Sequence, residues 1–240
     1  MLLVHGFPLD GRVWEGVLPH LLPMRRVLNL DLRGFGNSDA SPAFSMRQLA
    51  LDVAAFLKLT GLPPLPVVGL SMGGYVVQEL ARQAPELITH LILVDTKAEA
   101  DTVEAQNKRN KMADIAREKG AAGVAEQMVP AMLSANPDPS AVAKLREIIL
   151  TQRPETLAQA SLAMRDREDF VELLTMLTMP VSIIVGEQDS ITPPVAARAL
   201  SERVKTGSFV QIAGAGHISP LEQPAAVAAA LLSLTESTVA

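Results

Sequence analysis

The chain has 240 residues, of which 48% are hydrophobic and 20% charged, and its formal net charge at pH 7 is −5. This length suits one domain with a substantial core and a modest insertion, and the charges form no basic block of the kind that nucleic acid or anionic lipid requires. The chain contains no cysteine, which excludes disulfides, thiolate nucleophiles and cysteine-ligated metals.

The N-terminal segment, MLLVHGFPLD, lacks the features of a secretory signal, because it has neither a basic n-region nor a sustained apolar h-region. The longest apolar stretch, AAVAAALLSL near the C-terminus, falls well short of the roughly 20 residues that span a bilayer. We therefore expect a soluble, cytoplasmic protein that binds neither nucleic acid nor a membrane.

Six short aliphatic runs bounded by turn residues predict β-strands. They are LLV (2–4), VLNL (27–30), VVGL (67–70), LILV (91–94), VSIIV (181–185) and FVQI (209–212). Near-continuous apolar strands indicate a sheet buried on both faces, and the segments between them are long enough for the helical crossovers that join parallel strands. The sequence predicts an α/β fold, with a mostly parallel sheet of about six strands flanked by helices.

The spacing of these strands is regular except between the fourth and the fifth, where helical patterning intervenes. There Asp101 and Glu104 are placed as a capping box, and Gly120 is placed at the C′ position of the same helix. Several helices inserted after the fourth strand predict a helical cap over residues 97–178. The predicted core then consists of two pieces, 1–96 and 179–240.

The segment GLSMG (69–73) matches the G-x-S-x-G nucleophile elbow, and it has the context that the motif requires, a strand before it and an amphipathic helix after it. The bare pattern arises by chance in about one chain of this length in ten, so the context carries the prediction. Gly69 and Gly73 would let the strand and the helix approach, and Ser71 would have a strained backbone. The alternative is an ordinary strand-to-helix turn.

A serine hydroxyl needs a histidine to take its proton and a carboxylate to orient that histidine. His217 lies in AGAGHISPLEQP directly after the last predicted strand, in a loop that we expect to be exposed. His90 leads into the LILV strand and His20 lies in a polar helical stretch, so both are expected to be structural or solvent-facing. His5 is expected to brace its loop. The predicted base is therefore His217.

Two acidic residues compete for the orienting role. Asp189 lies in VGEQDSITPP, in the loop that leaves the VSIIV strand, and Asp95 ends the LILV strand at the edge of the sheet where ligands bind. We favour Asp189 because it gives the chain order Ser, Asp, His that is typical of this elbow. Asp95 stays the alternative, and Glu187 is a weaker candidate that we expect to be a solvated loop residue.

Two backbone N–H groups are predicted to bind the oxyanion of the tetrahedral intermediate. One belongs to Met72, the residue after the nucleophile, at the positive end of the following helix. The other belongs to Phe7 in the HGF segment that follows the first strand, where Gly6 would allow a close approach of the backbone.

Five motifs resemble those of the α/β-hydrolase superfamily, in the same order and with similar spacing, over essentially the whole chain. They are HGFPLDGRVW, NLDLRGFGNSD, GLSMGGYVVQE, VGEQDSITP and AGHISPLEQP. Within the superfamily the chain looks most like bacterial carboxylesterases and 3-oxoadipate enol-lactonase-like hydrolases. The resemblance implies a triad of Ser71, His217 and Asp189, an oxyanion hole at Phe7 and Met72, no cofactor or metal, and a helical cap.

The chain departs from that pattern at its N-terminus. Relatives usually begin with an antiparallel pair of strands before the HG loop, whereas this chain starts almost on that loop's strand. We therefore expect the antiparallel pair to be missing and the VLNL strand to be a sheet edge. Because an uncovered edge can pair with another chain, this predicts lower stability or self-association, for example as a homodimer.

The expected function is hydrolysis of a small carboxylic ester. One alternative is an enol-lactonase, which uses the same machinery on an acidic cyclic ester and would need a cationic pocket residue such as Arg109, Arg165 or Arg167. The other alternative, from a different class, is a ligand-sensing protein with slow turnover, because fold alone does not determine function. Haloalkane dehalogenases and epoxide hydrolases place aspartate at the elbow, so Ser71 argues against both.

Overall fold

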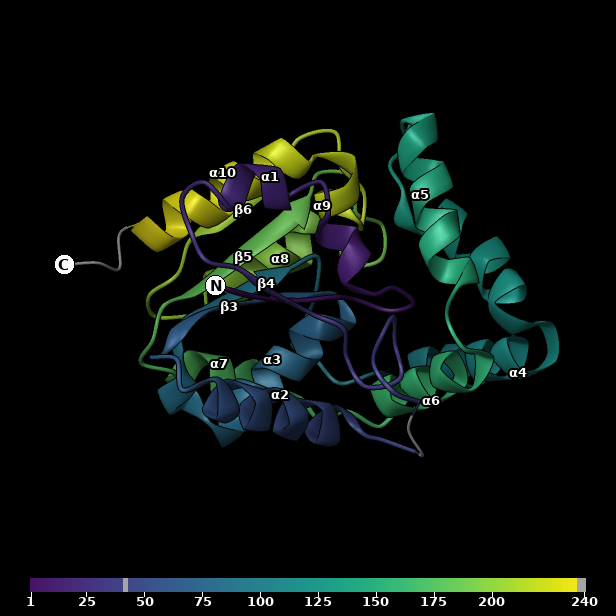
Figure 1. Cartoon of the computed structure of the whole chain (residues 1–240), viewed down its shortest axis with the longest axis horizontal. Coiled ribbons are helices and arrows are strands. Elements are labelled where there is room, and N and C mark those ends of the chain that lie inside the picture. The colour runs from purple at the N-terminus through teal and green to yellow at the C-terminus, as the bar shows by residue number, and fades with distance from the viewer. Residues whose placement is uncertain (41–42, 237–240) are drawn as a thin grey trace.

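A six-stranded sheet forms the centre of the computed structural model, which describes residues 1–40 and 43–236 (Figure 1). Its strands lie in the order β2-β1-β3-β4-β5-β6, and each neighbouring pair is parallel. The strands are β1 (Leu2–Val4), β2 (Leu28–Leu30), β3 (Leu65–Leu70), β4 (Ile88–Val94), β5 (Val181–Gly186) and β6 (Phe209–Ile212). The predicted α/β fold with a parallel sheet of about six strands is confirmed.

Helices cover both faces of this sheet. In Figure 1, α1 (Leu18–Leu21) and α10 (Pro224–Glu236) lie over one face, and α2 (Met46–Thr60) and α3 (Met72–Gln83) lie over the other. Every residue of β1 and of β5 is buried, which explains why these strands are aliphatic runs rather than alternating patterns. The other short elements outside the insertion are η1 (Gly11–Trp14), η2 (Pro85–Leu87), α8 (Pro194–Ser201) and α9 (Ser219–Glu222).

Four helices lie between β4 and β5, where the sequence predicts the cap. They are α4 (Val103–Met132), α5 (Pro139–Leu150), α6 (Pro154–Arg165) and α7 (Val171–Met176). In Figure 1, α4, α5 and α6 stand to one side of the sheet, and α5 contacts η1 and α9. Although α4 spans 30 residues, no helix in the described part of the chain is long and apolar enough to cross a bilayer. The division of the chain into core and cap stays a prediction.

The predicted capping box of α4 is wrong by one residue. Thr102 is the N-cap, and its hydroxyl accepts a hydrogen bond from the Ala105 N–H at 3.3 Å. Asp101 is instead buried and forms ion pairs with Arg109 and Arg167, at 3.1 and 2.8 Å. Because its carboxylate is held in those ion pairs, the cap is left to the next residue with a side-chain oxygen.

The first inserted helix is predicted to end at Gly120, and the structure has a kink at this residue. Gly120 has φ 65° and ψ −163°, a conformation outside the helical region that glycine tolerates. Helical backbone resumes directly after it and continues to Met132. Gly120 therefore divides α4 into two helical segments, and the first of them ends where the sequence predicts.

Strand β2, the predicted VLNL strand, lies at one edge of the sheet. Within residues 1–40 and 43–236, no strand pairs with its outer side and no antiparallel pair is present. Leu28 and Leu30 are half-buried and Asn29 is exposed. Self-association through this edge stays a prediction.

The strand register brings several loops together at the carboxyl edge of the sheet. Leu70 of β3 lies opposite Val94 of β4, and Val94 lies opposite Ile184 of β5. The residues that follow each of these strands therefore lie side by side. In open parallel sheets this edge is where ligands bind.

Candidate active site

Ser71 lies at the sharp turn between β3 and α3, where it is the N-cap residue of the helix. Its backbone has φ 50° and ψ −112°, a left-handed φ that is costly for any residue with a Cβ. The turn is held on both sides, because the Ser71 N–H donates to Val94 O at 2.9 Å and the Thr96 hydroxyl donates to Ser71 O at 2.8 Å. The predicted strain at Ser71 is therefore present.

Glycines give this turn the space it needs. A Cβ on Gly69 would lie 2.5 Å from Gly73 O, and a Cβ on Gly73 would lie 2.5 Å from the carbonyl oxygens of Val4 and His5. These are backbone atoms, so a larger residue would force β3, α3 and β1 apart. The flanking glycines thus allow the close contact that the motif predicts.

The structure brings the three predicted triad residues together. The Ser71 hydroxyl lies 2.8 Å from His217 Nε2, and His217 Nδ1 lies 2.9 Å from Asp189 Oδ2. Asp189 comes from the loop after β5 and His217 from the loop after β6. Because a carboxylate can only accept, the imidazole proton is assigned to Nδ1, which leaves Nε2 free to accept the serine proton.

His217 itself is buried, so the prediction of exposure is wrong at this residue. It is only 2% exposed, and its N–H donates to Met132 O, at the end of α4, at 2.8 Å. The inserted helix therefore covers the histidine, which a reading of the loop's local sequence does not show. Ser71 is half-buried.

Asp189 is held as a carboxylate by several donors. Its Oδ1 accepts from the N–H groups of Ile191 and Thr192, both at 2.8 Å, and its Oδ2 accepts from the Thr192 hydroxyl at 2.5 Å. Burial raises the pKa of Asp189, but His217 and Thr192 together outweigh burial and hold the pKa below its ordinary value. This carboxylate is ionised at neutral pH.

Neither competing acid reaches the histidine. The carboxylate of Asp95 accepts hydrogen bonds from Gly186 and Ser219, and Glu187 accepts one from the Gly214 N–H at 2.9 Å on the surface. The pKa of Asp95 is raised to about 7, mainly by burial and secondly by the negative charge of Asp189. His217 Nδ1 thus donates its hydrogen bond to Asp189, and the Thr192 hydroxyl is a second neighbour of Nδ1 at 3.3 Å.

The other histidines lie away from Ser71 Oγ. His5 is fully buried, accepts from the Leu32 N–H through Nε2 at 3.0 Å and donates to Gly6 O through Nδ1 at 3.0 Å. Burial lowers the pKa of His5, so its imidazole is neutral. His90 lies within β4, with Nε2 2.8 Å from the Ser182 hydroxyl, and His20 is exposed on α1. These positions agree with the loop-bracing and structural or solvent-facing roles predicted for them.

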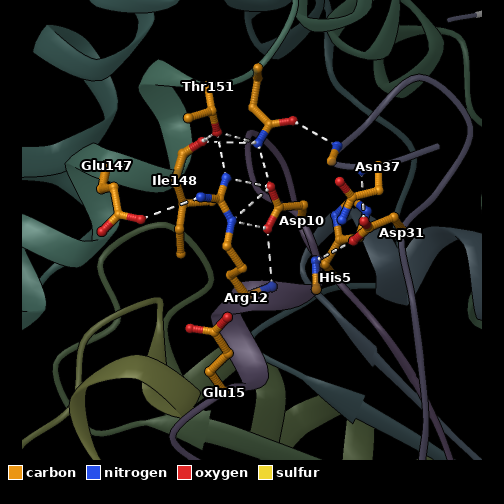
Figure 2. A network of polar contacts seen from close by, with 12 residues as sticks. His5, Asp10, Arg12, Glu15, Asp31, Asn37, Glu147, Ile148 and Thr151 are labelled. Carbon is orange, nitrogen blue, oxygen red and sulfur yellow. Dashed lines mark hydrogen bonds and ion pairs between the residues drawn. The ribbon is translucent and has the colours of Figure 1, made fainter. Parts of the chain in front are cut away.

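The loop that follows β1 is tied to the inserted helices by a polar network (Figure 2). Asp10 accepts from the Arg12 guanidinium and from the Gln152 amide, both at 2.7 Å. Arg12 also reaches Glu147 at 3.3 Å and the Thr151 hydroxyl, both on or directly after α5. Burial raises the pKa of Asp10, but its bonds to Arg12 and Gln152 outweigh burial and lower it. The loop and α5 therefore hold one another in place.

The same loop carries the predicted oxyanion donor Phe7. A Cβ on Gly6 would lie 3.0 Å from both Leu70 O and Ser71 Cβ, so the backbone before Phe7 runs directly against the elbow. Met72 is the first residue of α3. In the described part of the chain no hydrogen bond uses the N–H of Phe7 or of Met72. Their role as the oxyanion hole stays a prediction.

Two side chains at this site are not predicted from the sequence. Thr192 bonds Asp189, and a D-x-x-T spacing that allows a hydroxyl to reach back to an aspartate is the one signal that could have found it. Glu222 of α9 accepts from the Gly216 N–H at 2.7 Å and from the Ser134 hydroxyl at 2.6 Å. It thereby joins the loop of His217 to the end of α4, and no local pattern indicates a partner 88 residues away.

Replacing Glu222 with glutamine is expected to lower kcat for an ester about 10-fold, with little change in KM. The single oxygen of an amide can accept from Ser134 or from Gly216, but its NH₂ group cannot accept from the other. One buried donor therefore loses its acceptor, and the loop of His217 shifts. Steady-state kinetics with a thermal unfolding curve will measure both effects. The matched control is Glu118→Gln, an exposed glutamate on α4, and equal kinetics for the two variants would contradict this role.

Comparison with known proteins decides the family. The sequence profile described as alpha/beta hydrolase fold matches residues 1–224. The chain belongs to the α/β-hydrolase family. No group of three or more histidine, cysteine or acidic side chains in the described residues of this α/β hydrolase is arranged to hold a metal ion.

Relatives of this α/β hydrolase include esterases and lactonases. An esterase structure from Thermogutta terrifontis is 37% identical, with a TM-score of 0.96, and the match covers 100% of this chain and 90% of that one. A pimeloyl-[acyl-carrier protein] methyl ester esterase of Nitrosomonas europaea is 30% identical over 234 residues, 93% of this chain and 90% of its own. The 3-oxoadipate enol-lactonase 2 of Acinetobacter baylyi is 28% identical over 220 residues, 89% and 80% of the two chains. These likenesses support a hydrolase activity.

Proposed function

We propose that this α/β hydrolase is a carboxylesterase that cleaves small carboxylic esters through an acyl-enzyme on Ser71. The observation that carries the proposal is the unbroken chain of hydrogen bonds from the Ser71 hydroxyl through His217 to Asp189. A nucleophile, a base and an orienting acid in contact are what acyl transfer by serine requires.

In the acylation step, Ser71 Oγ attacks the ester carbonyl carbon while its proton moves to His217 Nε2. Asp189 stabilises the imidazolium that forms, and the N–H groups of Phe7 and Met72 bind the oxygen that becomes negative. One such donor contributes about 10²- to 10³-fold to kcat in serine hydrolases. The intermediate collapses when the C–O bond to the alcohol breaks, and the alcohol leaves with the proton from His217.

In the deacylation step, a water molecule gives a proton to His217 Nε2 and attacks the acyl carbon. The bond from that carbon to Ser71 Oγ then breaks, and the serine recovers its proton from the imidazolium. The carboxylic acid is released and the enzyme returns to its starting state.

The arginines support an ester rather than an acidic enol-lactone as the substrate. Arg109 and Arg167 are ion-paired with the buried Asp101, and Arg165 is held by Asp166 at 2.7 Å. Guanidinium groups already directed at carboxylates of the protein are not oriented to receive the carboxylate of a lactone. The lactonase and the slow ligand-sensing protein are the alternatives that the experiment must separate.

The test compares p-nitrophenyl acetate, butyrate and octanoate with an enol-lactone that carries a free carboxylate. We expect multiple turnovers on the neutral esters, with kcat/KM at least about 10-fold above the lactone value, which corresponds to ~1.4 kcal/mol in the transition state. A preference for the lactone would contradict the carboxylesterase proposal in favour of the lactonase. A single stoichiometric burst without turnover would favour the ligand-sensing protein.

A further inference from the structure

A second buried carboxylate lies beneath the proposed triad. Asp95 follows the last residue of β4 and is fully buried. Its φ is 45°, and in the described residues only Ser71, at the end of the neighbouring strand β3, is another non-glycine residue with a left-handed φ. Strained backbone of this kind persists where the surroundings over-determine it, most often at functional sites.

The Asp95 side chain bonds both loops that carry the other triad members. Its Oδ1 accepts from the Gly186 N–H at 2.7 Å, and Gly186 lies three residues before Asp189. Its Oδ2 accepts from the N–H of Ser219 at 3.1 Å and contacts the Ser219 hydroxyl at 2.6 Å, two residues after His217. One carboxylate therefore links the two loops.

The backbone around Asp95 adds the nucleophile to this arrangement. The Ser71 N–H donates to the carbonyl of Val94, the residue before Asp95, and the Asp95 N–H donates to Ile184 O of β5, both at 2.9 Å. The loops of Asp189 and His217 are closely packed, because a Cβ on Gly186 would lie 2.0 Å from the carbonyl oxygen of Gly216, the residue before His217. A shift at Asp95 would move all three triad residues relative to one another.

From this geometry we propose that Asp95 is a positioning residue that holds the loops of Asp189 and His217 in register with Ser71. The proposal rests on the proposed function, because it concerns the alignment of that same triad. Asp95 acts through its neighbours and touches no substrate atom. It also explains why a second acid lies beside the one that orients the imidazole.

Only a carboxyl group fits all of these partners. Three donors converge on its two oxygens, and an ionised carboxylate offers about four lone pairs to receive them. An asparagine in this place would direct its NH₂ group at the N–H of either Gly186 or Ser219. One of the two loops would then lose its anchor.

The charge of Asp95 couples to the same groups. The titratable side chains that face it are Asp189 and His217, and burial and the charge of Asp189 raise the pKa of Asp95 to about 7. As the pH rises through 7, Asp95 therefore gains a negative charge that stabilises the imidazolium. The pH profile thus offers a readout that a purely structural residue would not change.

The experiment compares Asp95→Asn and Ser219→Ala with wild type on p-nitrophenyl butyrate. We expect kcat to fall about 30-fold in Asp95→Asn and about 5-fold in Ser219→Ala, within the ~10²-fold that a misplaced catalytic group costs, with KM within 2-fold. The profile of kcat/KM against pH should lose an ionisation near pH 7 in Asp95→Asn only. Ser219→Ala keeps Asp95 and serves as the second variant where Asp95→Asn folds poorly.

Ser182→Ala is the matched control, because Ser182 is another buried serine that contacts a histidine, at the opposite end of β5. It should lower stability without changing kcat or the pH profile. Wild-type kcat and an unchanged profile in Asp95→Asn would overturn the inference. Because Ser71→Ala tests the proposed function separately, an inactive Ser71→Ala beside a fully active Asp95→Asn would contradict only the positioning role.

Discussion

Replacing Ser71 with alanine is expected to lower kcat for p-nitrophenyl butyrate by about 10⁴- to 10⁶-fold, the range found when a serine nucleophile is removed from a hydrolase. The variant loses the atom that forms the acyl-enzyme, while His217 and Asp189 keep their own hydrogen bond. Alanine also fits the left-handed turn no worse than serine, so the fold should be retained. Steady-state kinetics and labelling by a fluorophosphonate will measure the loss.

The control for this variant is Ser161→Ala, which removes a fully buried serine hydroxyl that bonds Arg109 O at 2.9 Å on the inserted helices. It should keep wild-type kcat and be labelled by the fluorophosphonate as wild type is. Turnover in Ser71→Ala within 10-fold of wild type would contradict the nucleophile assignment. So would a label found on any residue other than Ser71.

Replacing Asp189 with asparagine is expected to lower kcat by about 10⁴-fold, with a folded enzyme and a small change in KM. An amide presents an NH₂ group to His217 Nδ1, so the imidazole must carry its proton on Nε2 and can no longer accept the proton of Ser71. The Thr192 hydroxyl and two backbone donors also lose a charged acceptor. The pH profile of the residual activity should then rise with hydroxide concentration.

Glu187→Gln is the natural comparison, because Glu187 is two residues away and, among the residues that the structure describes, its carboxylate bonds only the Gly214 N–H on the surface. Its kcat should stay within 2-fold of wild type. If kcat fell further in Asp95→Asn than in Asp189→Asn, the two roles would be reversed and Asp95 would be the residue that orients the imidazole. The pair of variants therefore decides a choice that the sequence leaves open.

The inserted helices form hydrogen bonds with the loops that carry the proposed triad. The carbonyl of Met132 receives the His217 N–H, and Ser134 shares Glu222 with the same loop. On the other side, the Ala135 N–H donates to Gln188, the neighbour of Asp189, at 2.9 Å. The end of α4 thus contacts the loops of His217 and Asp189, the same two loops that Asp95 bonds.

Much of the fold follows from local sequence patterns. The aliphatic runs predict the six strands in order, and strands such as β1 and β5 are apolar throughout because both of their faces are buried. The elbow is equally local, since only glycines at 69 and 73 allow β3 and α3 to approach around Ser71. The Asp101 cap fails for the opposite reason, because distant arginines occupy its carboxylate.

The sequence by itself determined the strand order along the chain, the strained serine turn and the short list of histidines and acids that could act with it. Only the tertiary structure decided that Asp189 and not Asp95 reaches His217, that the histidine is buried, and that Glu222 joins its loop to α4. Turn and strand preferences act over a few residues and are visible in the chain. The contacts that select one acid span tens of residues, and they exist only once packing has brought the loops to one edge of the sheet.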